Sequence, residues 1–71
     1  MPKDSTINGL GGVIKSARNS KQLTQKELSA TLGISTRYLK YIENGYYKPS
    51  YALLKSIVAA LDIPGEFVFK K

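Results

Sequence analysis

Five polar side chains between positions 36 and 44 have the types and spacing to bind a polar ligand along one face of a helix. They are Thr36, Arg37, Lys40, Tyr41 and Asn44, at spacings of i, i+1, i+4, i+5 and i+8. The planar guanidinium of Arg37 can donate two hydrogen bonds to O6 and N7 of a guanine, and Lys40 can pair with a phosphate. This face favours contact with nucleic acid, although Arg37 could instead contact only phosphate or solvent.

The residue types that most enzymes and metal sites need are missing. The chain has no cysteine and no histidine, which removes thiol nucleophiles, thiolate metal sites, the usual general base and the commonest metal ligand. The five carboxylates are scattered and form no ligand-like cluster: Asp4, Glu27, Glu43, Asp62 and Glu66. We therefore do not expect an enzyme, and the sequence indicates no metal, cofactor or small-molecule effector.

Length and charge restrict the class of protein further. With 71 residues the chain has room for one domain, which we place at 1–71 with its core over about 8–69 and a flexible start at 1–7. The net charge of +6 favours a polyanionic partner, or merely keeps the protein soluble. No apolar run reaches the ~20 residues that span a bilayer, and the start lacks the apolar stretch of a secretory signal. We expect a cytoplasmic protein without membrane contact.

The elements that must position the polar face are all expected to be helices. An apolar stripe that begins at Leu10 predicts a helix over about 8–20, although three glycines weaken its start. The capping box Thr-Gln-Lys-Glu begins a second helix over about 24–32, which Gly33 ends. After a three-residue turn, Ser35 can cap a third helix over about 36–44.

Two further helices are expected in the second half of the chain. Ser50 can cap a helix that extends to Leu61, and Asp62 can serve as its stop. Its predicted core stripe consists of Tyr51, Leu54, Ile57, Val58 and Leu61. Pro64 fits the first turn of a brief fifth helix that would press Phe67 and Val68 onto the core. No segment alternates with period two, so the sequence predicts an all-α fold of five helices.

Two short helices joined by a three-residue turn that contains glycine have the sequence shape of a helix-turn-helix. The segment LTQKELSATLGISTRYLKYIENGY, residues 23–46, resembles the phage repressor and Cro-like family, also called the XRE family, in its TQ-x-x-L, GIS and IENG elements. The resemblance extends from about Leu10 to Val68. It implies a compact lambda-repressor-like fold and sequence-specific binding of double-stranded DNA by a homodimer, with the helix over 36–44 in the major groove. We expect a transcriptional regulator, more readily a repressor than an activator.

The resemblance also assigns roles to individual residues. Base contacts in the family come from the positions of Thr36, Arg37 and Tyr41, whereas Tyr38 is expected to be part-buried. Gln25, at the amino end of the second helix, matches a glutamine that binds the DNA backbone and supports the recognition helix, which is the helix over 36–44 in this chain. Further backbone contacts are expected from Ser35, Lys40, Asn44, Tyr46, Tyr47 and Lys48.

Arg18 and Glu43 are expected to form a structural ion pair. Each follows a predicted core residue, and the family pairs an arginine and a glutamate at these two positions. A shielded Glu43 without a partner would be costly, and the fork of Arg18 matches a carboxylate in two places. The alternative is that both are surface charges that contribute little to stability.

Three features depart from the family pattern. The loop over residues 46–48 carries two tyrosines where relatives usually have two or more basic residues. Gln22 stands where many relatives have glycine, and Ser29 where a small apolar residue is usual. Neither of these two substitutions is expected to disturb the fold.

The strongest rival hypothesis is a protein-interaction adaptor, or an antagonist of a regulator, that keeps the same fold. Leu53, off the predicted core stripe, and Phe69 could serve such a role or form a modest homodimer surface. An adaptor, however, has no need for a basic polar face on the third helix. Membrane-surface binding is disfavoured because the lysines do not gather on one amphipathic helix. RNA binding stays open, although no aromatic stacking platform or Gly-x-x-Gly clamp is present.

Overall fold

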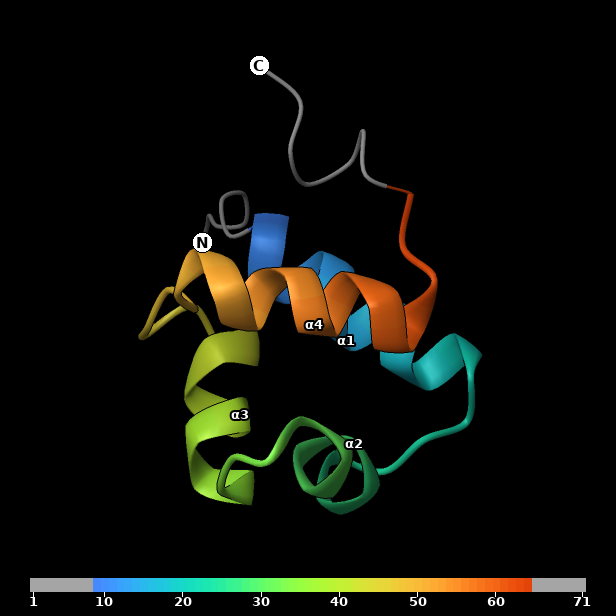
Figure 1. Cartoon of the computed structure of the whole chain (residues 1–71), viewed down its shortest axis with the longest axis horizontal. Coiled ribbons are helices and arrows are strands. Elements are labelled where there is room, and N and C mark those ends of the chain that lie inside the picture. Colours follow the sequence, from blue (N-terminus) through green and yellow to red (C-terminus); the bar gives the residue numbers. More distant parts are fainter. Residues whose placement is uncertain (1–8, 65–71) are drawn as a thin grey trace.

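The computed structural model describes residues 9–64, which form four helices around one core (Figure 1). In chain order these are α1 (Gly9–Ser20), α2 (Gln25–Leu32), α3 (Thr36–Glu43) and α4 (Tyr51–Leu61). Residues 9–64 contain no strand, so the all-α class is confirmed for that part of the chain. The predicted fifth helix, with Phe67 and Val68, lies outside the described residues. No helix within 9–64 is long and apolar enough to cross a membrane.

Hydroxyl side chains begin three of the helices, at the positions that the sequence predicts. The hydroxyls of Thr24, Ser35 and Ser50 each accept a hydrogen bond from the backbone amide three residues later. The side chain of Glu27 in turn accepts a hydrogen bond from the backbone amide of Thr24 at 2.8 Å, which completes the capping box. The third helix ends at Glu43, one residue earlier than predicted.

All four helices end in the same type of turn. A residue with positive φ follows the helix, and the amide of the next residue donates to a carbonyl five positions back. The positive-φ residues are Gln22, Gly33, Gly45 and Asp62. After three of these turns comes an apolar side chain that packs against the core: Leu23, Ile34 or Ile63. Asp62 therefore does stop α4, while Gln22 holds a conformation that is unfavourable for a residue with a Cβ.

The core is a single cluster of aliphatic side chains from the four helices and from Ile63, which follows α4. Its buried members are Ile14, Leu28, Leu39, Ile42, Ile57, Leu61 and Ile63. The predicted inclusion of Tyr51 is wrong, because 68% of this residue is exposed. Leu53, expected off the core stripe, packs against the core instead. The buried face of α4 runs through residues 53, 57 and 61, so Leu53 no longer supports the adaptor hypothesis.

Gly11 allows α1 to lie directly against the end of α3. A Cβ at this buried position would lie 2.5 Å from the carbonyl oxygen of Glu43 and 2.8 Å from that of Ile42. Real Cβ atoms do not approach backbone oxygens so closely, so any side chain here would push the two helices apart. A Cβ added to Gly9 or Gly12 would meet no other atom within 4 Å. One of the three glycines that weaken the start of α1 is therefore required by packing.

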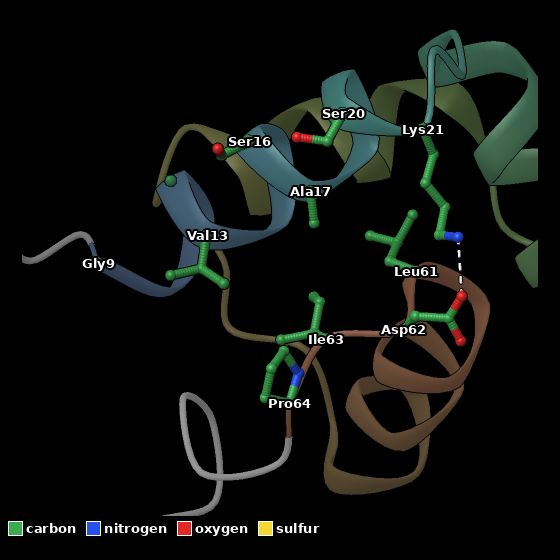
Figure 2. Close-up of a pocket in the computed structure, with 11 residues that line it drawn as sticks. Gly9, Val13, Ser16, Ala17, Ser20, Lys21, Leu61, Asp62, Ile63 and Pro64 are labelled. Carbon is green, nitrogen blue, oxygen red and sulfur yellow. Dashed lines mark ion pairs between the residues drawn. The ribbon is translucent and has the colours of Figure 1, made fainter.

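An apolar groove lies between α1 and the end of α4, with a volume of about 740 Å³ (Figure 2). Val13 and Ala17 of α1 line one wall, and Ile63 lies on the other. At the rim, Lys21 Nζ and an oxygen of Asp62 form an ion pair at 2.7 Å. The groove has no lining residue from α2 or α3, so it is separate from the surface described next.

Candidate nucleic-acid interface

The helices α2 and α3 are joined by a three-residue turn and fixed to each other by buried side chains. Leu28, Leu39 and Ile42 are buried between the helices, and Ile34 in the turn packs against the same core. Gly33 in the left-handed region lets the chain leave α2 and enter α3 without a longer loop. In Figure 1, α2 is seen nearly end-on, α3 runs from top to bottom of the view beside it, and α4 crosses the view above them with α1 behind. The core therefore holds α3 in a fixed orientation relative to the other helices.

The outward face of α3 presents charged and polar groups that have no partner among residues 9–64. Arg37 and Lys40 are exposed, and Asn44 at the carboxyl end is exposed as well. Their side chains form no hydrogen bond or ion pair with the described part of the chain. Lys48, in the loop that follows, is likewise exposed. These donors are available to an anionic or hydrogen-bonding ligand.

Thr36, the first residue of α3, differs from the other predicted base contacts because its hydroxyl is already engaged. The residue is half-buried, and its Oγ1 lies 3.0 Å from Oγ of Ser29 in α2. Ser29 is only 3% exposed and also donates to the carbonyl of Lys26 at 3.0 Å. The sequence marked Ser29 only as a departure from the family pattern. The sequence did contain a signal for this contact, because Ser29 lies on the buried side of the predicted second helix and Thr36 begins the third.

Four tyrosines gather around the carboxyl end of α3; we call them the tyrosine cluster: Tyr38, Tyr41, Tyr46 and Tyr47. The half-buried ring of Tyr41 meets the two loop rings edge to face, with centroids 5.9 Å from Tyr46 and 5.2 Å from Tyr47. Tyr38 is part-buried against the core, as predicted, and its ring lies 6.0 Å from that of Tyr47. The loop therefore holds the ring of Tyr41 in place.

Behind the exposed face, one buried carboxylate joins three helices. Arg18 of α1 donates from Nε to Oε2 of Glu43 at 2.7 Å, and from Nη2 to Oε1 at 3.2 Å. Its Nη1 also donates to the carbonyl of Leu23 at 2.7 Å. Gln25 at the start of α2 donates from Nε2 to Oε1 of Glu43 at 3.0 Å. Arg18 and Glu43 are 7% and 6% exposed, so the structure joins the two residues that the sequence pairs, away from solvent.

Residues 14–68 match a protein family described as Helix-turn-helix. The chain belongs to this family. The match covers most of the chain and includes α2, the turn and α3, so the family predicted from residues 23–46 is confirmed. The exposed polar face of α3 therefore lies within the part of this protein that matches the family.

Several curated proteins are similar to it. The chain is 43% identical over 54 residues to the ImmF control region 10 kDa protein of Bacillus phage phi105. This alignment covers 76% of the present chain and 60% of the phage protein. It is 40% identical over 55 residues to Transcriptional regulator ClgR of Mycobacterium tuberculosis, with coverages of 78% and 49%. The Immunity repressor protein of Bacillus phage phi105 is 37% identical over 54 residues, with coverages of 76% and 38%. The chain thus spans roughly half the length of these relatives.

Proposed function

We propose that this helix-turn-helix protein binds a specific double-stranded DNA sequence as a cytoplasmic homodimer and represses transcription there. The observation that carries the proposal is the outward face of α3. Arg37, Lys40 and Asn44 are exposed there and have no hydrogen-bond or ion-pair partner within residues 9–64, while buried contacts fix the opposite side of the helix. The net charge of +6 suits a polyanionic ligand. The name of one relative, the immunity repressor, supports repression rather than activation.

In this proposal α3 enters the major groove, which is ~12 Å wide and admits one helix. Arg37 donates two hydrogen bonds to a guanine, and Thr36 contacts a neighbouring base. Tyr41, held by the rings of the loop, offers ring carbons to a thymine methyl group. The rigid support behind α3 keeps these contacts in one register along the groove.

Contacts to the DNA backbone surround the base contacts. The Nε2 group of Gln25 has two protons, and Glu43 uses one of them, so the other can be donated to a phosphate. Ser35 accepts a hydrogen bond through its oxygen when it caps α3, and its own proton is therefore free for a phosphate. The remaining backbone contacts come from Lys40, Asn44, Lys48 and the phenols of Tyr46 and Tyr47.

A dimer follows from the small size of the reading surface. One short helix contacts too few base pairs to select a single site in a genome. Two copies would contact half-sites about one helical turn, ~34 Å, apart on one face of the duplex.

Selection of bound sequences from a random duplex pool, followed by footprinting and a salt titration of the enriched site, tests the proposal. We expect an enriched sequence with two protected half-sites. A single asymmetric half-site at saturation would contradict the dimer, and a pool with no enriched sequence would contradict specific binding.

A further inference from the structure

The Ser29 hydroxyl lies directly behind the first residue of the recognition helix. Its Oγ is 3.0 Å from the carbonyl oxygen of Lys26 and 3.0 Å from Oγ1 of Thr36. Because Ser29 is 3% exposed, water has little access to replace either contact. Thr36 is half-buried, so one side of it faces Ser29 while the other remains available to a ligand.

The directions of these two hydrogen bonds follow from a count of protons. A hydroxyl has one proton and two lone pairs, whereas a carbonyl oxygen can only accept. Both contacts can be hydrogen bonds at once only if Ser29 donates to Lys26 and Thr36 donates to Ser29. The opposite direction would leave the contact between Ser29 and the Lys26 carbonyl without a proton, in a place shielded from water.

We propose that Ser29 fixes the Thr36 hydroxyl as a hydrogen-bond acceptor toward DNA and thereby sets which base this residue selects. The proposal rests on the proposed function, in which Thr36 contacts a base. With its proton held by Ser29, Thr36 can only accept a hydrogen bond from the base. In the major groove the donors are N6 of adenine and N4 of cytosine, whereas guanine and the thymine O4 present acceptors. Thr36 therefore favours an amino-bearing base, and Ser29 is a positioning residue that does not touch the DNA.

The substitution Ser29→Ala tests the proposal by removing the acceptor for the Thr36 proton. Thr36 can then donate as well as accept, so its preference for adenine or cytosine should fall about 2- to 10-fold, the effect of one neutral hydrogen bond. Selection from the random pool should show this change at one position of each half-site. The position is identified independently by Thr36→Val, which removes the hydroxyl while keeping the shape of the side chain.

The control is Thr31→Ala, also in α2. Thr31 is exposed, and its hydroxyl donates to the carbonyl of Glu27 at 3.1 Å and forms no hydrogen bond with α3. This variant loses the same kind of helix hydroxyl as Ser29→Ala, and its selected sequence should equal that of the wild type.

A double variant separates positioning from a general effect on packing. In the background of Thr36→Val, Ser29→Ala should produce no further change in base preference. A further change there would show that Ser29 acts on the packing of α3, and the proposal would be wrong. If Ser29→Ala failed to fold by circular dichroism, Thr36→Ser would decide. It keeps the hydroxyl and should retain the wild-type preference that Thr36→Val loses, and a loss in Thr36→Ser would overturn the proposal.

The outcomes distinguish this proposal from the function on which it rests. If the wild type enriched no sequence, specific DNA binding would be wrong. If the wild type selected a site and Ser29→Ala selected the identical site with identical preference at every position, only the role of Ser29 would be wrong. A wild-type preference for guanine or thymine at the position that Thr36→Val identifies would also overturn it.

Discussion

Loss of either partner of the buried ion pair between Arg18 and Glu43 is expected to remove most of the stability of the protein. The Glu43 carboxylate accepts hydrogen bonds from two nitrogens of Arg18 and from Gln25. Glu43 is 6% exposed in the wild type, and alanine at position 18 would leave its charge with the neutral amide of Gln25 as its one remaining partner among residues 9–64. Alanine at position 43 would leave the guanidinium with the Leu23 carbonyl alone.

The expected cost follows from burial. Breaking a buried ion pair by removing one partner costs about 3–5 kcal/mol, whereas the core of a chain this small rarely supplies more than ~5 kcal/mol of stability. The exposed pair between Lys21 and Asp62 is a matched control. Its nitrogen and oxygen are also 2.7 Å apart, but its side chains are 39% and 77% exposed. Lys21→Ala should therefore cost no more than ~1 kcal/mol.

Urea unfolding followed by circular dichroism measures these differences. The wild type should be the most stable, followed by Lys21→Ala and then by the double variant Arg18→Met with Glu43→Leu. The two single alanine variants of the buried pair should be the least stable. The double variant removes both charges together, so it should be more stable than either single one. Two single variants within ~1 kcal/mol of the wild type would refute the reasoning, because burial would then add nothing to the cost of breaking the pair.

Three other predictions use single substitutions. Gly11→Ala should destabilise the protein by about 1–3 kcal/mol through its clash with backbone carbonyls, whereas Gly12→Ala should stabilise it by up to ~1 kcal/mol; thermal melts that shift in the same direction would contradict this. Gln22→Gly should raise the melting temperature, with a gain of up to ~1 kcal/mol, because it relieves the positive φ. Arg37→Ala should cost about 1–3 kcal/mol on the preferred site and relax one base pair. Lys48→Ala should weaken binding to all sequences, and it should lower the slope of the logarithm of the binding constant against that of the salt concentration by about one unit per half-site. If Arg37→Ala and Lys48→Ala both lost affinity equally on specific and random DNA, the assignment of Arg37 as a base contact would be wrong.

Local signals predict much of the fold. A hydroxyl begins three of the helices, and a residue that tolerates positive φ follows three of them: Gly33, Gly45 or Asp62. Both signals act within a few residues, so the sequence shows them directly. The phase of α4 was less well determined, because residues 51–54 read Tyr-Ala-Leu-Leu and leave two helical stripes open. Packing decides between them: Leu53 packs against the core, and Tyr51 lies exposed with the Lys55 ammonium 5.5 Å from its ring centroid.

Contacts between distant residues are the part that local patterns do not reveal. Gly11 looks like a weak helix residue until the carbonyls of α3 are placed beside it. The partner of Arg18 is 25 positions away along the chain, and only the family resemblance indicated it. In both cases the physical requirement, open space or an opposite charge, comes from another helix.

The same reasoning applies to the recognition surface. Helical periodicity identifies which residues of α3 face outward, but it does not say in which hydrogen-bonding state they do so. For Arg37 this makes no difference, because a guanidinium can only donate. A threonine hydroxyl can donate or accept, and at Thr36 the choice depends on Ser29 in the preceding helix. Two proteins of this family with identical exposed residues on α3, but with serine or alanine at this buried position, would therefore present different chemistry to the same base pair.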